Sequence, residues 1–584
     1  MSKRTIIAFV IIGIIFLFYD DYLRWLYPPA PETGTDSTAV ATTETGRRET
    51  KHAGRGEYYL RSSAEDSLRT VVEEKRPVAL IEKTESLPER FVTIKTSRFR
   101  ARFTSAGARL VSFRLEPNGR YLLEEEELSP PNKSHQPSFR FWTYDGPVET
   151  NGMEFRLAGD DDGGDREYRV GEGETRRIEF TTSLSDDRSL SVIYTFNGDD
   201  YTFNCRLRGV GLEKTWVRDY AEVYWDGGLA YTEPDTAQDY MYSKAYVYFE
   251  GDEMETQKIN SKKDVMIGPL SGATRWGAIR TKYFMAALIP EAGEAVGGWL
   301  ESRHDSTLTG RHHPNRLGVG LRLPLVNGVP NTPIKVFVGP IDYDVLGSVD
   351  PSLRRTMNWG WKVIAPFSKG ILWALKKLGH VVPNYGLCII IFSILIKVIV
   401  WPLTRKSYHS MAAMQRLQPK IQQLREKYKS EPQRVQTEMM KLYKAEKVNP
   451  MGGCLPVMLQ MPLLYGLFIV FRTTIEFRNA PFVFWIKDLS QPDIIFHLPM
   501  SLPLYGDHVA LLPILMGIST FFQSKSTMTD PNQKMMLYFM PILMTLLFNQ
   551  FPSGLTLYYT LFNLFTLIQQ KITPPPKPAE VKSS

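Results

Sequence analysis

The chain has 584 residues and a formal net charge of +7, so it is long enough for more than one domain. Of its three cysteines, Cys388 and Cys454 fall in apolar segments, so Cys205 has no partner for an internal disulfide in the polar part. The sequence has no G-x-x-x-x-G-K-[ST] loop, no H-E-x-x-H motif and no C-x-x-C pair. Nucleotide hydrolysis and a structural zinc site therefore lack their usual signatures, and we expect neither a cofactor nor a metal.

Residues 1–27 contain the first apolar segment. Lys3 and Arg4 precede an uncharged run over 6–19, and two aspartates follow it. A cleaved signal peptide and an uncleaved anchor both begin in this way. Because no small-x-small cleavage site follows the run, we favour a transmembrane anchor whose positive N-terminus stays in the cytoplasm.

Residues 28–88 are predicted to be a flexible periplasmic linker. As far as residue 57 they consist of Thr, Gly, Ala, Pro and charged residues, with Val40 as the one large aliphatic side chain. From 89 to 345 the sequence changes to short segments rich in β-branched and aromatic residues, which indicates a large periplasmic β-sandwich domain. Strands are predicted at 91–95, 98–103, 110–115, 177–180, 190–196, 201–207, 240–249, 283–289 and 334–338.

One cluster in this domain could suggest a site. His304, His312 and His313 lie close to Asp305 and Arg311 in the sequence. Glycine and proline nearby and the lack of helical spacing favour a solvated loop over a catalytic set.

Residues 359–380 change to a helical period. Phe367, Ile371, Leu372, Leu375 and Leu378 recur at helical spacing, and three lysines lie on the opposite side. This pattern predicts an amphipathic helix on the periplasmic membrane surface, because the segment is too polar to cross the bilayer.

Residues 386–404 are apolar enough to cross a bilayer, yet they contain Lys397. Nineteen helical residues span about 28 Å, which matches a hydrocarbon core. Ser393 and Thr404 share one polar stripe with the lysine. A lysine inside a membrane costs about 2.5–3.5 kcal/mol and suggests a functional site. A side chain that extends its ammonium to the cytoplasmic interface is the alternative, and the position alone leaves both open.

Residues 405–447 are predicted to form two cytoplasmic helices that make a hairpin. Apolar residues follow a three-four pattern on each side of the break at Glu431-Pro432. Eleven Lys or Arg residues face four Glu residues in this stretch. The excess marks the cytoplasmic side, and it could also hold an RNA-rich or acidic partner.

Four further spans are predicted at 454–471, 509–523, 535–551 and 553–572, followed by a short cytoplasmic tail at 573–584. The basic loops alternate as the positive-inside rule requires, so the chain is expected to have six transmembrane helices with both termini in the cytoplasm. Polar residues inside these spans join helices or line a wet interior, and they are Gln460, Gln523, Thr545, Asn549, Tyr558, Tyr559 and Asn563.

Several motifs in the C-terminal half resemble the YidC/Oxa/Alb family of membrane protein insertases in the same order. They are LQPKIQQLREKY (417–428), MMKLYKAEKVNP (439–450), NPMGGCLPVMLQMPLLYGLF (449–468), APFVFWIKDLS (480–490), TDPNQKMMLYFMP (529–541) and FPSGLTLYY (551–559). The large exported domain after a first anchor is similar to the Gram-negative form of the family.

The resemblance implies a five-helix insertase core with a hydrophilic groove through which client segments cross. The groove charge of the family is usually an arginine, and the matching position here is Lys397, which keeps the charge but loses the planar fork. The expected polar lining consists of Ser393, Gln460, Tyr558, Tyr559 and Asn563, and the expected apolar client slide consists of Met458, Leu459, Leu463, Ile514 and Met516.

The resemblance also implies a multi-pass protein of the bacterial inner membrane that is not an enzyme. Its expected partners are nascent membrane proteins, the Sec translocon, the ribosome with the signal-recognition targeting machinery, and the lipid bilayer; no sequence-specific nucleic acid is expected. Two other classes remain as alternatives. One is a polytopic transporter, although no internal repeat is visible. The other is a membrane-anchored periplasmic carbohydrate-binding protein or enzyme.

Cysteines placed at Gln423 and Gln436 test the predicted topology. Both positions lie in the hairpin, so impermeant thiol reagents are expected to label them only after the cytoplasmic face is opened. Labelling from the outside of intact cells would contradict the cytoplasmic placement.

Overall fold

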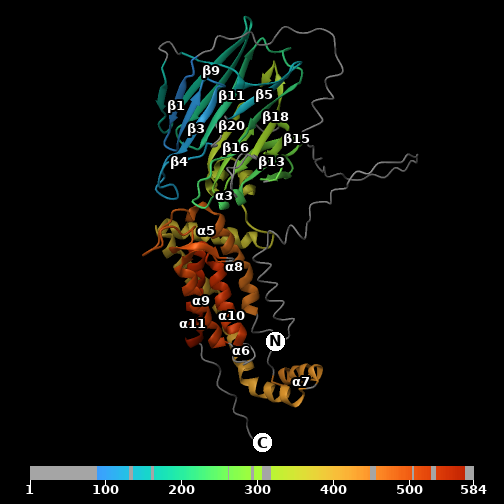
Figure 1. Ribbon diagram of the computed structural model, residues 1–584, viewed down its shortest axis with the longest axis vertical. Helices are drawn as coiled ribbons and strands as arrows, with labels where there is room; N and C mark the ends of the chain where they lie inside the picture. The colour runs from blue at the N-terminus through green and yellow to red at the C-terminus, as the bar shows by residue number, and fades with distance from the viewer. Residues whose placement is uncertain are drawn as a thin grey trace, which may run out of the picture. The chain divides into compact units, whose positions relative to one another are not determined.

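The computed structural model describes residues 88–129, 136–159, 164–260, 262–290, 295–304, 317–429, 431–446, 455–502, 505–527 and 534–572. The predicted anchor at 1–27, almost all of the linker, His312 and His313, and the tail at 573–584 lie outside these residues. The chain forms two compact units, a β-rich unit that comprises residues up to Met357 together with Thr473–Glu476, and a helical unit that comprises the other residues from Asn358 onward. Figure 1 shows their elements.

The β-rich unit contains two sheets. The smaller sheet has the order β4 (Glu126–Glu127), β3 (Arg109–Leu115), β2 (Phe99–Thr104), β1 (Phe91–Lys95), β8 (Arg166–Arg169). Its one parallel pair is β1–β8. The larger sheet has fifteen strands. Its main order is β6 (Gly146–Glu149), β5 (Ser138–Thr143), β12 (Tyr220–Trp225), β18 (Leu317–Val326), β17 (Ala295–Ser302), β15 (Val265–Arg280), β16 (Phe284–Pro290), β20 (Ile334–Pro340), β11 (Thr202–Val210), β10 (Arg188–Asn197), β9 (Thr175–Ser185), β7 (Arg156–Leu157). The strands β13 (Lys244–Phe249), β14 (Met254–Lys258) and β19 (Val329–Pro330) pair beside this path.

Aromatic side chains join the two sheets face to face. In β2 every second side chain is buried, which turns Phe99 and Phe103 toward the core. The Phe103 ring lies 4.6 Å from the ring of Tyr194, 5.5 Å from that of Phe196 and 6.0 Å from that of Phe203, all on the larger sheet. This packing confirms the predicted two-sheet core of the exported domain.

Most predicted strands coincide with observed ones, but the strand predicted at 240–249 is wrong in its first half. The helix α3 (Thr236–Tyr242) occupies those residues, and β13 begins only at Lys244. Asp235 caps α3, and the buried carboxylate of Asp239 accepts hydrogen bonds from the backbone N–H groups of Thr232, Glu233 and Lys282. These long-range contacts fix a helix where local composition favours a strand. Burial also raises the pKa of Asp239.

The unit has three further short helical segments that the sequence patterns did not indicate, the 3-10 helix η1 (Thr150–Gly152), α4 (Tyr343–Val349) and the 3-10 helix η2 (Pro351–Thr356). The sixteen-residue strand β15 was also missed. Its Gly268-Pro269 and Gly272 are typical of turns, but register shifts after Ile267 and Ser271 absorb them within the strand.

The helical unit contains α5 (Ala365–Val381), α6 (Tyr385–Lys427), α7 (Pro432–Ala445), α8 (Leu455–Thr473), α9 (Leu511–Thr527), α10 (Lys534–Phe548) and α11 (Ser553–Ile572). The helix α9 packs against α10 and α11, and α11 also packs against α6 (Figure 1). In the described residues one helical segment, Tyr385–Pro402, is both long and apolar enough to cross a membrane, and Leu537–Phe548 is a shorter apolar helix.

No helix ends at residue 405, where the sequence predicted the boundary between the membrane span and the cytoplasmic hairpin. Asn384 caps the start of α6, and the helix then runs for 43 residues through Pro402 and Pro419. The residues after 404 are good helix formers, so the loss of single backbone donors at the prolines does not end the helix. The first arm of the predicted hairpin is therefore a continuation of the apolar segment, and α7 is its second arm.

The helix α5 confirms part of the predicted amphipathic pattern. Ile371, Leu372 and Leu375 are buried, whereas Phe367, which was assigned to the same apolar face, is 40% exposed. Leu378 is half-buried.

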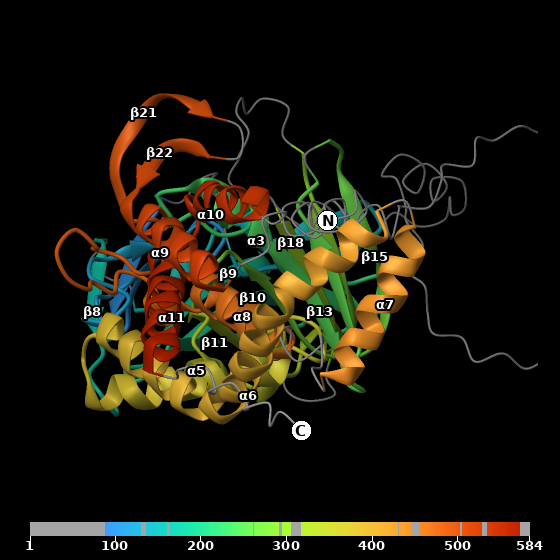
Figure 2. The ribbon, with the colours of Figure 1, turned by 90° about the horizontal axis from the view of Figure 1, so that it is seen from below.

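Two strands precede α9, β21 (Ile494–Leu502) and β22 (Gly506–Ala510), and they form an antiparallel hairpin (Figure 2). The span predicted at 509–523 therefore starts two residues too early, because Val509 and Ala510 belong to β22. The sequence IIFHLPMSL lacks a clear alternation and contains a proline, so the patterns gave no strand there.

Loss of the Phe103 ring is expected to destabilise the β-rich unit by about 3–5 kcal/mol, because Phe103→Ala leaves a cavity between the sheets. Cys205 on β11 is fully buried, so the rate at which a reagent labels its thiol measures how often the unit opens. With Cys388 and Cys454 replaced by alanine, its thiol labelling should accelerate at least about a hundredfold, since each 1.4 kcal/mol changes the open population tenfold. Tyr144→Ala, at a 73% exposed position, is the control and should label like the parent protein. Equal rates for Phe103→Ala and the parent would contradict the packing argument.

Candidate functional site

Lys397 lies in the apolar part of α6 and is 7% exposed. Its Nζ donates a hydrogen bond to Oγ1 of Thr566 at 2.5 Å and lies 3.6 Å from the centroid of the Phe562 ring. Both partners belong to α11. The ammonium is therefore buried and held by a neighbouring helix. A lysine that extended its ammonium to the cytoplasmic interface would instead have an exposed ammonium.

The partners of Lys397 are neutral. Thr566 Oγ1 accepts from Lys397 and donates to the carbonyl oxygen of Phe562 at 2.6 Å, so its hydrogen-bonding capacity is used in both directions. The Phe562 ring contributes a cation–π contact. In the part of the chain that the structure describes, no Asp or Glu forms an ion pair with Lys397. Within the described residues, the site thus holds a cation without a counter-ion.

A second polar contact joins the same two helices. Gln569 Nε2 donates to Thr404 Oγ1 at 2.8 Å, and both side chains are buried. Lys397 pairs with Thr566 and Thr404 pairs with Gln569, so α6 and α11 run in the same direction along this contact. We refer to these four residues as the α6–α11 polar seam.

The predicted lining residues occupy different places around the seam. Ser393 is fully buried and donates to the carbonyl oxygen of Ile389 at 2.7 Å, within its own helix. Tyr558 is 1% exposed, stands on the same side of α11 as Phe562 and Thr566, and its hydroxyl has no hydrogen-bond partner among the described residues. The ring of Tyr558 lies 6.4 Å from that of Phe392 on α6.

The other three lining residues face elsewhere. Asn563 donates to Ser519 and Thr520 on α9, at 3.2 and 2.9 Å. It thereby joins two helices, which is the alternative role considered for polar residues in spans. The Tyr559 ring lies 5.1 Å from the ring of Phe548 on α10. Gln460 is half-buried on α8.

The predicted apolar slide is spread over two helices. Ile514 lines an apolar pocket between α9 and α10, together with residues such as Ile518, Phe522 and Tyr538. Met516 is 1% exposed, so in this structure it is a core residue that no client can reach. Leu463 on α8 is half-buried, and the side chains of Met458 and Leu459 lie outside the description.

Sequence patterns missed Phe562, Thr566 and Gln569. The positions 563, 566 and 569 carry polar residues at intervals of three along this helix. Residues three apart are neighbours on a helix surface, so this spacing could have identified Thr566 and Gln569 as contact residues for one neighbouring helix, although Asn563 contacts another.

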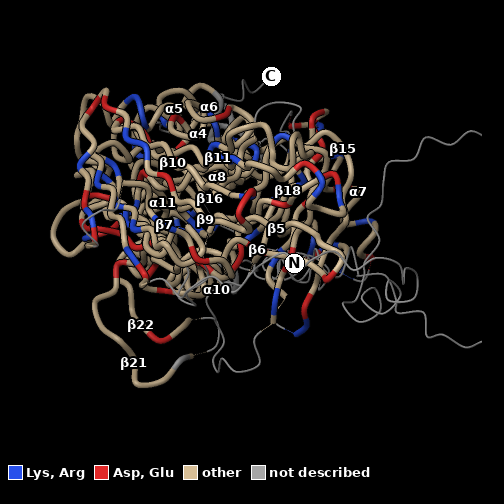
Figure 3. Tube along the Cα trace, turned by 90° about the horizontal axis from the view of Figure 1, so that it is seen from above, with Lys and Arg blue, Asp and Glu red and all other residues tan. Residues whose placement is uncertain are grey.

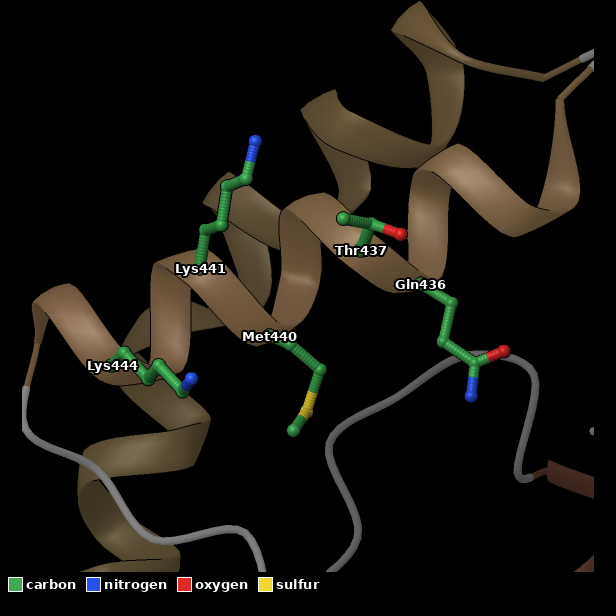
Figure 4. Close-up of a pocket in the computed structure, with 5 residues that line it drawn as sticks. All are labelled: Gln436, Thr437, Met440, Lys441 and Lys444. Carbon is green, nitrogen blue, oxygen red and sulfur yellow. The ribbon is translucent and has the colours of Figure 1, made fainter.

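A second concave surface lies on the arm α7. Gln436, Thr437, Met440, Lys441 and Lys444 line a shallow pocket, and Figure 4 shows all five side chains on this one helix. No described residue of α7 is buried. Among the described residues, one ion pair joins the two arms, between Lys420 and Glu446 at 2.6 Å, and both of its side chains are exposed. Among the residues with assigned positions, no group of three or more His, Cys, Asp or Glu could hold a metal ion.

Family models and sequence relatives give the same assignment over most of the chain. Residues 377–577 match the family model described as 60Kd inner membrane protein, and residues 91–374 match that of the YidC periplasmic domain. The membrane protein insertase YidC of Chlorobaculum parvum is 34% identical over 98% of this chain and 94% of its own length. That of Chlorobium luteolum is 37% identical over 82% of each chain. A solved structure of an active YidC insertase overlaps 81% of this chain and 90% of its own, with a TM-score of 0.34 and 20% identity.

Since these matches cover both units in full-length relatives, the chain belongs to the YidC family of membrane protein insertases, inner-membrane proteins that carry a periplasmic domain.

Proposed function

We propose that this protein inserts newly made proteins into the bacterial inner membrane, and that Lys397 supplies the positive charge that attracts the client's polar segment. The observation that supports this role is a buried ammonium held by a hydroxyl and a ring, with no carboxylate partner in the part of the chain that the structure describes. Two charges 4 Å apart attract by about 4 kcal/mol at an effective dielectric constant of 20, so an acidic client residue can replace Thr566 as the partner.

The proposed topology has six spans, the anchor at 1–27 followed by the apolar part of α6 and by α8, α9, α10 and α11. The common direction of α6 and α11 at the polar seam supports it, because both helices would then run from the periplasm to the cytoplasm. The helices α9 and α10 have 17 and 15 residues. At 1.5 Å per residue their described parts reach about 22–26 Å, less than a 30 Å hydrocarbon core. We propose that the bilayer is thinner around these helices, which shortens the path of a client.

The proposed mechanism needs no covalent step and no enzyme chemistry. A client tail enters from the cytoplasm, its acidic group pairs with Lys397, and the tail then crosses the remaining thin layer. The membrane potential helps, since an anionic residue that moves outward gains about 2.3 kcal/mol per 100 mV. Burial of the client's apolar helix in lipid, at about 25 cal/mol per Å² of apolar surface, then makes insertion favourable.

The arms of the cytoplasmic hairpin are the proposed place of first client contact. The second arm, α7, has no buried residue and carries the pocket around Met440, so little packing energy opposes its displacement. The Sec translocon, the ribosome and the targeting machinery are proposed as partners on the strength of the family resemblance.

Charge variants of Lys397 test the proposal. Lys397→Arg is expected to insert clients normally. Lys397→Leu should slow the insertion of an acidic-tailed client at least about tenfold, and Lys397→Glu should slow it further through repulsion. A neutral-tailed client should be affected less. The measurement is client insertion by variants present at equal levels. Equal activity of Lys397→Leu and the parent on both clients would overturn the role of the charge.

A charge swap tests whether the ammonium can act from either helix, as long as it occupies the same place between α6 and α11. Lys397→Thr alone should lose insertion of the acidic-tailed client. The double variant Lys397→Thr with Thr566→Lys restores an ammonium next to a hydroxyl with the lysine on α11, and should recover a large part of the activity. A double variant no better than Lys397→Thr would argue against the contact seen between these two side chains.

A further inference from the structure

We propose that the β21–β22 hairpin is a membrane-binding element that lies in the interfacial region of the bilayer, in the leaflet where α9 begins, with lipid as its partner. This surface lies apart from the polar seam and is independent of the insertion chemistry around Lys397. The inference rests on the proposed span of α9.

The first observation is that β21 exposes apolar side chains on both of its faces. Ile494, Ile495 and Phe496 are 39%, 45% and 52% exposed, and Met500 and Leu502 are 65% and 41% exposed. Neighbouring residues of a strand point to opposite faces, so neither face of the strand packs against the rest of the protein. A partner protein with a flat surface would cover one face only, whereas a fluid apolar solvent covers both.

The second observation is the absence of charge. The strand Ile494–Leu502 contains no Lys, Arg, Asp or Glu, and its trace in Figure 3 carries neither charge colour. Exposed apolar patches of this kind mark protein or membrane contacts in soluble units. Next to a membrane helix, the lack of charge favours lipid.

The backbone of the hairpin limits how deep it can lie. Both strands are edge strands, and the register shifts between Ile494 and Phe496 and between His497 and Leu502 leave the pairing irregular. Unpaired N–H and C=O groups cost several kcal/mol each in hydrocarbon, and an isolated two-stranded hairpin is marginally stable in water. The interfacial region of the bilayer avoids both problems. Headgroups and water there form hydrogen bonds with the unpaired backbone groups, and acyl chains cover the apolar side chains.

The base of the hairpin is fixed at the ends of two helices. Asn549, just after α10, is fully buried and accepts from the backbone N–H of Ala510 at 3.0 Å. Its Nδ2 donates to the carbonyl oxygens of Tyr505 and His508, at 2.8 and 2.7 Å. These bonds place β22 at the level of the C-terminal end of α10, and α9 begins directly after β22 at Leu511.

A second set of hydrogen bonds fixes the start of β21 next to the start of α9. Asp493, directly before β21, accepts from the backbone N–H of Leu512 at the start of α9 and from Trp485 Nε1, at 2.8 and 2.9 Å. The neighbouring Phe484 is 91% exposed. Trp is enriched at the membrane interface, and Asp493 holds Trp485 beside the start of α9. Figure 2 shows the hairpin projecting from α9 and α10.

The apolar surface of the hairpin continues that of these helices. Ile518 on α9 and Ile542 on α10 are 50% and 60% exposed. If these helices span the bilayer, lipid covers those side chains. The same lipid, one layer closer to the headgroups, is then the nearest apolar medium for Phe496 and Met500.

The proposal is tested with single cysteines that carry an environment-sensitive fluorophore. In a full-length protein with Cys205, Cys388 and Cys454 replaced by alanine, we place the label at Phe496 or at Met500, and at Asp507 as the matched control. Asp507 lies on β22 of the same hairpin, and its side chain is 65% exposed. The proteins are reconstituted in bilayers that contain lipids brominated either near the headgroup end of the acyl chain or near its terminal methyl.

We expect the labels at Phe496 and Met500 to be quenched by the lipids brominated near the headgroups, by about twofold or more, and less by the deeply brominated ones, as a surface-lying element requires. The label at Asp507 should be quenched less than either. Absence of lipid quenching at both test positions would overturn the proposal. Blue-shifted emission without lipid quenching would also overturn it, because the occupant would then be a protein, either a client or a second copy.

A charged variant gives a second measurement. Met500→Asp should weaken the lipid quenching of the label at Phe496, because the interface then loses an apolar contact and gains a charge. Unchanged quenching would contradict a contact made by the whole strand. Insertion of the acidic-tailed client is measured on the same samples, so a failure of this proposal with normal insertion leaves the role of Lys397 intact.

Discussion

The burial of one ammonium between α6 and α11 constrains the rest of the helical unit. An uncompensated charge in an apolar environment is costly, so α11 must present a hydroxyl and a ring at the height of Lys397, and it does so with Thr566 and Phe562. That face of α11 is then fixed. Asn563 consequently turns toward Ser519 and Thr520 and fastens α9. The orientation of three helices thus follows from the placement of one charge.

Sequence patterns predicted the parts of this architecture that local periodicity determines. The strand at Phe91–Lys95 was predicted with its observed bounds because its side chains alternate between core and solvent. The helix at Ser553–Ile572 was found in the same way, as a long apolar run after Pro552. What failed was decided by distant contacts. Asp239 binds one backbone group that lies 43 residues away, at Lys282, and keeps α3 helical, and the partner of Lys397 lies 169 residues further along the chain. No local period contains such information, although the polar residues at intervals of three on α11 indicated a contact face.

Two polar residues of the predicted spans, Asn563 and Lys397, have different partners in the structure. Asn563 and Lys397 both appeared as polar groups inside spans, yet the amide is satisfied by two neutral partners on α9, whereas the ammonium has no counter-ion among the described residues. A satisfied amide stabilises a helix contact. An ammonium that lacks an anion gains more from a new acidic partner than from its present neutral one, which makes the lysine the responsive member of the pair.

The helix α6 joins the lysine to the cytoplasmic arm without a break. At 1.5 Å per residue the 43 residues of this helix form a rod about 65 Å long. Lys397 stands in one half of it and the basic arm around Arg425 in the other. No loop separates the two, although Pro402 and Pro419 inside the helix are positions at which it can bend. The distance along the chain between the buried lysine and the cytoplasmic arm is therefore set by the helical rise, about 42 Å from Lys397 to Arg425.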